Sequence, residues 1–100
     1  MLVLVFSYEA RDPVEFERVY GPDGEWAEFF RLGAGYVGTE LLRDVAEPGR
    51  YLVIDRWASR ESYQAFVEEH RDEYMRRVDE TAFHHDRELR LGTFENVWDA

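Results

Sequence analysis

Two strand-like segments of this chain carry large apolar side chains on both of their faces, and few folds can accommodate such strands. Residues 2–8 read LVLVFSY and residues 50–57 read RYLVIDRW, so that apolar residues occupy both alternating sets of positions. Successive side chains of a strand point to opposite faces of its sheet. One face can therefore pack against helices, while the other face still needs a cover.

Helix and turn signals set the order of the remaining elements. Asp12 and Pro13 favour a helix start, and apolar spacing predicts helical pieces at about 13–20 and 24–32, interrupted by GPDG. Ser59 is predicted to cap a further helix whose apolar positions run to Val78. The predicted strands are 2–8, 36–44, 50–57 and 87–98.

This β-α-β-β-α-β order predicts an α+β, ferredoxin-like fold in a single domain spanning residues 1–100. We expect a four-stranded, mainly antiparallel sheet with both helices on one face. A second subunit is the simplest cover for the other apolar face, so we predict a homodimer. Aromatic residues make up 16% of the chain, more ring surface than a small monomer easily hides. A gap between the sheet and the helices would form a pocket.

Charge and cysteine content exclude several classes of function. The formal net charge is -10, with 22 acidic and 12 basic residues, which disfavours binding to nucleic acid or to anionic membrane surfaces. The chain has no cysteine, so a disulfide framework, a thiolate nucleophile and a cysteine-ligated metal are excluded. The first apolar run is too short to span a membrane and lacks a basic leader, so we expect a cytoplasmic protein.

The segments GYVGTELLRD and YLVIDRWASRESYQAF carry a recognisable pattern. Gly35, Tyr36 and Gly38 lead into one strand, and the next strand ends in Trp57-x-Ser59 before an amphipathic helix. This pattern resembles the antibiotic biosynthesis monooxygenase family. The resemblance implies a dimeric α+β barrel built from ferredoxin-like subunits.

The family includes cofactor-independent oxygenases of polycyclic aromatics and quinols, and also haem-degrading oxygenases. The haem-degrading members use an asparagine on the first strand, the tryptophan of Trp-x-Ser and a histidine on the following helix. Here Trp57 matches, but the first strand offers Ser7 and Tyr8, and Phe66 and Val67 stand at the usual histidine positions. The resemblance therefore implies a cofactor-independent monooxygenase acting on a small aromatic compound of the quinol or polyketide type. The alternative is a non-catalytic dimeric domain that binds a small ligand or haem.

Trp57 and His70 are the catalytic candidates. Trp57 either seals the core or stacks on a flat aromatic ligand, and these two roles can coexist. His70 lies on the apolar stripe of the last predicted helix. It is either a packing residue or a base that takes a phenolic proton, a task for which the near-neutral pKa of imidazole is suited.

Further aromatic side chains are candidates for contact with the ligand, and packing is the alternative role for each. The predicted ligand-binding residues are Tyr8, Tyr36, Tyr51, Phe66 and Tyr74. No metal site is predicted, because the adjacent His84 and His85 would point to opposite faces of a strand. If residues 82–86 are extended, one of these two histidines could face inward.

Overall fold

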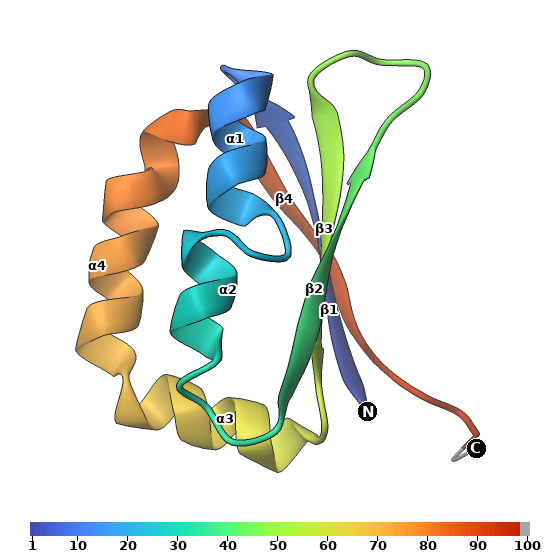
Figure 1. The fold of residues 1–100 in the computed structure, drawn as a ribbon. Helices are drawn as coiled ribbons and strands as arrows, with labels where there is room; N and C mark the ends of the chain where they lie inside the picture. The colour runs from blue at the N-terminus through green and yellow to red at the C-terminus, as the bar shows by residue number, and fades with distance from the viewer. Residues whose placement is uncertain (99–100) are drawn as a thin grey trace.

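The computed structural model describes residues 1–98, and its elements follow the predicted order (Figure 1). They are β1 (Leu2–Ala10), α1 (Pro13–Tyr20), α2 (Glu25–Phe30), β2 (Tyr36–Arg43), β3 (Arg50–Trp57), α3 (Arg60–Glu69), α4 (Arg71–Thr81), a short 3-10 helix (Ala82–His84) and β4 (His85–Glu95). The α+β, ferredoxin-like prediction is confirmed.

The four strands form one sheet in the order β2-β3-β1-β4, and every pair of neighbours is antiparallel. Helices α1 to α4 all lie on one side of this sheet, and α2 lies between α4 and the sheet (Figure 1). The register pairs Leu2 with Trp57 and Tyr8 with Tyr51, and it sets the inward face of β1 against the inward face of β3.

Local side-chain hydrogen bonds define where the helices begin. The Asp12 carboxylate accepts hydrogen bonds from the backbone N–H groups of Val14 and Glu15, and Pro13 occupies the first helical position. At α3, Ser59 and Ser62 form a reciprocal capping box. Both helix starts therefore lie where the sequence predicts them.

The helix predicted to run from Ser59 to Val78 is in fact two helices, α3 and α4, and His70 separates them. His70 has φ -114° and ψ 27°, which takes the backbone out of the helical region. The chain changes direction there, so that α4 runs alongside α2 (Figure 1). Apolar periodicity did not reveal the break because both helices present their apolar sides to the same core.

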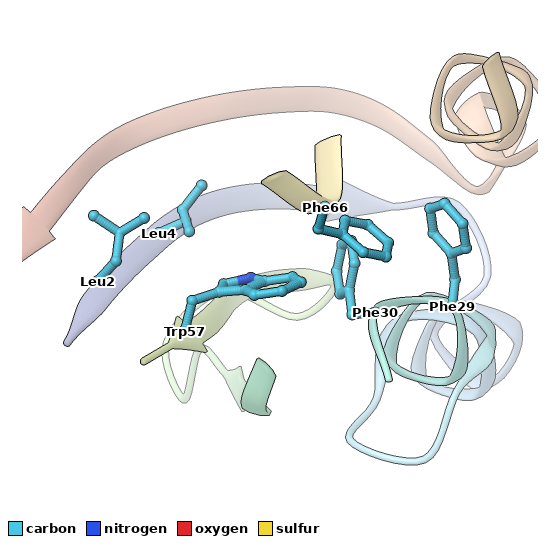
Figure 2. Packing of buried hydrophobic residues seen from close by; sticks show 6 residues of the cluster. All are labelled: Leu2, Leu4, Phe29, Phe30, Trp57 and Phe66. Atoms are coloured by element: carbon cyan, nitrogen blue, oxygen red, sulfur yellow. The ribbon is translucent and has the colours of Figure 1, made fainter. Parts of the chain in front are cut away.

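Two groups of buried side chains fill the space between the sheet and the helices. The first group is Leu2, Leu4, Phe29, Phe30, Trp57 and Phe66. Figure 2 shows the Trp57 ring extending from β3 towards Phe30 and Phe66, with both leucines of β1 on its other side. The second group is Tyr8, Phe16, Val19, Tyr20, Tyr51 and Val53. The first group packs against α2 and α3, and the second packs against α1.

The opposite face of the sheet is not covered by any helix (Figure 1). Its side chains include Leu42, Leu52 and Leu89, which the register places in one row across the sheet, with Ser7 of β1 between Leu52 and Leu89. Leu42 and Leu89 are 41% and 48% exposed. We call this surface the open face. Separately, none of the helices within residues 1–98 is long and apolar enough to cross a membrane.

Gly33 makes room for the aromatic core, and this yields a test of the fold. A Cβ atom at Gly33 would lie 2.6 Å from Phe66 Cδ1 and 2.8 Å from Trp57 Cζ3. We expect Gly33→Ala to lower the free energy of unfolding by about 1–3 kcal/mol, because the added methyl overpacks the core. Urea unfolding measures the loss.

The control is Gly38→Ala in β2, where an added Cβ would meet no atom within 4 Å. This variant is expected to be neutral or slightly more stable, since alanine loses less backbone entropy than glycine on folding. Equal effects of the two substitutions would contradict the packing described for Trp57.

Candidate functional site

A cavity with a volume of about 60 Å³ lies between the sheet and the helices. Its wall is mostly aromatic, with a few polar side chains. The residues that line it include Phe6, Tyr8, Trp26, Asp55, Tyr74 and His85. This volume holds a few ordered water molecules and is well below the roughly 300–1,000 Å³ of typical small-molecule pockets. A ring compound can therefore enter only if a wall side chain moves.

Asp55 is the buried carboxylate of the cavity. It lies on the inward face of β3 between Val53 and Trp57, and it is 8% exposed. Thr39 stands directly opposite on β2, and its hydroxyl donates a hydrogen bond of 2.6 Å to Asp55 Oδ1. Burial raises the pKa of Asp55 to about 6, and the Thr39 hydrogen bond only partly opposes this rise.

A chain of hydroxyl groups leads from Asp55 towards the surface. The Tyr36 hydroxyl lies 2.6 Å from Thr39 Oγ1. Thr39 has a single hydroxyl proton and gives it to Asp55, so Tyr36 must be the donor in the contact between Tyr36 and Thr39. The predicted ligand residue Tyr36 thus connects to the cavity through Thr39.

His85 and Tyr8 form the part of the wall next to β4. Their ring centroids are 4.9 Å apart, and His85 Nε2 lies 3.7 Å from a carboxylate oxygen of Glu88. Burial lowers the pKa of His85. Burial, and next the charge of Glu88, raise the pKa of Tyr8 far above its usual value. Both groups are therefore uncharged near neutral pH, and His85 is the histidine of the adjacent pair that faces inward.

Trp26 lies between the cavity and a larger outer groove. The groove has a volume of about 530 Å³, is lined by charged residues of α1, α2 and α4, and shares Trp26 and Thr81 with the cavity wall. The buried Trp26 Nε1 makes no hydrogen bond within residues 1–98. Burial raises the pKa of Tyr20, and the nearby Thr81 and Trp26 side chains oppose that rise.

The two predicted catalytic residues lie outside the lining of this cavity. Trp57 is fully buried, with its ring centroid 5.8 Å from that of Phe30 and 5.1 Å from that of Phe66. The imidazole of His70 packs against Phe29 and Phe66, with centroid separations of 5.9 Å and 4.7 Å. Phe30 belongs to the cavity wall, so Trp57 packs behind that wall.

The predicted ligand residues divide in the same way. Tyr8 and Tyr74 line the cavity, and Tyr36 reaches it through Thr39. Phe66 is 2% exposed in the core. The Tyr51 hydroxyl donates a hydrogen bond of 2.6 Å to Glu17, away from the cavity.

The sequence interpretation missed Asp55, Thr39 and Trp26 as site residues. The signal for Asp55 was available, because it shares its face of β3 with Val53 and Trp57. A carboxylate among large apolar side chains on a buried face requires a special environment. Trp26 carried no such signal, since its pattern is that of an ordinary packing residue.

Comparison with known proteins identifies the fold's relatives. The family model for antibiotic biosynthesis monooxygenase matches residues 30–81. A crystal structure of a variant of SnoaB, a cofactor-independent oxygenase from Streptomyces nogalater, has a TM-score of 0.79 and 19% identity, covering 97% of this chain and 93% of that chain. The haem-degrader MhuD from Mycobacterium tuberculosis, solved with two haems bound, has a TM-score of 0.66 and 23% identity, covering 100% and 99%. No curated protein matches the chain.

The buried carboxylate should make stability depend on pH. The folded pKa of Asp55, about 6, exceeds the ordinary value of 3.8, so the folded state binds its proton more tightly than the unfolded chain. Asp55 therefore lowers the free energy of unfolding as pH rises through this window. We expect Asp55→Asn to be more stable than wild type above about pH 6, by up to about 3 kcal/mol.

This difference should shrink as pH falls towards about 4, where the native carboxyl is protonated. Urea unfolding of both proteins across the window measures it. Asp23→Asn serves as the control for loss of a carboxylate, because the Asp23 side chain is 96% exposed. A constant difference between Asp55→Asn and wild type would contradict the raised pKa.

Proposed function

Because the chain belongs to the antibiotic biosynthesis monooxygenase family, we propose that it is a cofactor-independent oxygenase of a small aromatic compound of the quinol or polyketide type. One observation carries the proposal. The space between sheet and helices contains a cavity with an aromatic wall and a buried carboxylate, which suits a flat ring that bears an ionisable hydroxyl group. The similarity in fold to SnoaB, a cofactor-independent oxygenase, adds support.

The proposed reaction needs a base, a dry cavity and dioxygen. Removal of a proton from a phenol or an enol leaves an electron-rich anion that can react with dioxygen directly. One oxygen atom becomes a carbonyl on a ring carbon, and the other leaves as water with the hydrogen of that carbon and the hydrogen of the hydroxyl group, which becomes the second carbonyl. The protein's part is to hold the ring, exclude water and accept the proton.

A ring is proposed to enter from the outer groove. Trp26 and Thr81 belong to both linings, and Trp26 is only partly buried. Movement of this single side chain would add space from the groove to the small cavity. The aromatic rings of Phe6, Tyr8 and Tyr74 would then contact the ligand from the other walls.

Catalytic roles for Trp57 and His70 stay predictions. Trp57 packs against Phe30 of the cavity wall, so it would act by holding that wall in place. His70 packs on Phe29 and Phe66, and it would need a rearrangement of those rings to reach a ligand in this cavity. Phe66 and Tyr51 stay predicted ligand residues, and they too would need a rearrangement to contact a ligand in this cavity.

Haem does not fit the residues of this cavity. The volume of about 60 Å³ has room for a few waters, and a macrocycle would displace most of the wall rather than one side chain. His85 is the histidine in the lining, and its ring packs against Tyr8. The alternative function is therefore non-catalytic binding of a small aromatic ligand.

We also propose that the chain forms a homodimer through the open face. This face exposes Leu42 and Leu89 in a row with Leu52, and an apolar surface of this kind on a sheet favours association. The net charge of -10 keeps anionic partners away, so nucleic acid and membranes are not proposed as partners. A cytoplasmic location stays a prediction.

The homodimer has a direct test. Light scattering at micromolar concentration is expected to give a mass close to twice the 11.9 kDa of one chain. Leu89→Glu should shift the protein towards the monomer, because it places a charge in the apolar interface. Val45→Glu is the control, since Val45 is fully exposed outside the strands. A wild-type mass near that of one chain would overturn the proposal.

The oxygenase activity is tested with an oxygen electrode. The protein is expected to consume dioxygen when given an anthrone or a naphthoquinol, with a chelator present and no flavin added. His70→Asn tests the predicted base, because loss of a general base typically costs about 10²–10⁴-fold in rate. Trp57→Phe tests the predicted stacking role of the indole.

Substrate binding without oxygen consumption would favour the non-catalytic alternative. A variant that loses stability but keeps its rate per folded molecule would assign a packing role to the substituted residue. Absence of both binding and turnover would refute the proposed function.

A further inference from the structure

We infer that Asp55 is the base of the cavity and that it takes the proton of a phenolic hydroxyl group bound there. The location of the ligand rests on the proposed function, whereas the proton transfer can be measured without turnover. Asp55 lines the cavity directly, so its carboxylate can touch a ligand.

The hydrogen bonding of Asp55 is incomplete. Oδ1 accepts the hydroxyl of Thr39, and no residue from 1 to 98 donates a hydrogen bond to Oδ2. A buried carboxylate with one neutral donor is costly, because it has lost its water and gained little in return. A ligand O–H group in the cavity supplies the missing donor. The cavity therefore favours a ring that carries a hydroxyl over the same ring without one.

Transfer of the phenolic proton to Asp55 creates no additional buried charge. The O–H bond of the phenol breaks, a new O–H bond forms on the carboxylate, and the negative charge moves to the phenolate. The Trp26 side chain belongs to the same wall. A buried acid that titrates near 6 is poised for such an exchange at neutral pH.

Thr39 and Tyr36 position and tune this carboxylate. Tyr36 donates to Thr39, and Thr39 donates to Asp55, both over 2.6 Å, so the two hydroxyl dipoles point towards the anion. The Thr39 hydrogen bond lowers the pKa of Asp55 against the larger effect of burial. Loss of the Thr39 hydroxyl should therefore move the proton uptake of Asp55 to higher pH.

Other titratable groups face Asp55 from the surrounding elements. They are Tyr20 on α1, Tyr8 on β1, Tyr36 on β2, Tyr74 on α4, and His85 and Glu88 on β4. Burial raises the pKa of all four tyrosines, so these phenols stay protonated near neutral pH. Glu88 is 43% exposed, which leaves His85 as the alternative base within this cavity.

The test uses 4-nitrophenol, whose phenolate absorbs at longer wavelength than the neutral form. Wild type is titrated with it below the pH at which the free phenol ionises, and the spectrum of the bound probe is recorded. Because 4-nitrophenol is a slightly weaker acid than Asp55, we expect a partial phenolate signal from the probe bound to wild type. The signal should be clearly smaller with Asp55→Asn, which keeps the shape of the side chain. 4-Nitroanisole, which has no acidic proton, should bind wild type more weakly than 4-nitrophenol does.

A phenolate signal with Asp55→Asn as large as with wild type would overturn the inference, and His85→Gln and His70→Asn would then locate the base. Failure of wild type to bind either probe would also overturn it. Phenolate formation without oxygen consumption on any quinol would leave Asp55 as the base and remove only the oxygenase function. If Asp55→Asn fails to fold, the phenolate signal of the probe bound to wild type is measured across pH instead. A titration midpoint of that signal away from about 6 would contradict the inference.

Two substitutions at Thr39 distinguish an effect of its hydroxyl group on the pKa of Asp55 from a role in packing alone. Thr39→Val removes the hydroxyl, so the onset of phenolate formation should shift to higher pH, whereas Thr39→Ser should restore the wild-type onset. An unchanged onset in Thr39→Val would show that Thr39 does not act on the carboxylate. If the protein turns over a quinol, Asp55→Asn should lower the rate by about 10²–10⁴-fold.

Discussion

A sheet with two apolar faces can cover only one of them with its own helices, and most of this structure follows from that constraint. All four helices lie on the side of the inward face of β1 and β3 (Figure 1), and Trp57 is fully buried there among aromatic rings. The outward face keeps a row of leucines at its surface. The division places the cavity on one side of the sheet and the proposed subunit contact on the other, so a ligand and a partner need not compete for the same surface.

The side chains of the inward face do not fill the space at the cavity completely. Asp55 interrupts a row of large apolar side chains, and the residues around it leave a small space instead of closing over it. A buried carboxylate with one hydroxyl donor costs stability, and such a cost persists where the group has a function. Trp26 has the complementary defect, a buried N–H group without a partner.

The sequence predicted the element order and a single helix-covered face of the sheet. Apolar residues at both alternating sets of positions identified β1 and β3, and capping residues located the starts of α1 and α3. It did not predict the break at His70, because two helices that share one core keep the same apolar period. It also did not predict the cavity, whose existence depends on how side chains from seven elements fill one space. Asp55 was not among the predicted site residues, although its position between Val53 and Trp57 on a buried face of β3 marked it.

Asp55 and Trp57 lie on the same face of β3, two positions apart. The orientation of the cavity carboxylate is therefore coupled to the packing of the core. A slip of β3 by one residue would turn both side chains to the open face, so the register that buries the indole also aims the carboxylate. Insertions in this strand are therefore barred for reasons of folding. Wall residues such as Trp26 and Tyr74 lie on helices, outside the sheet. Substitutions at these positions can change the shape of the cavity without disturbing the register of β3.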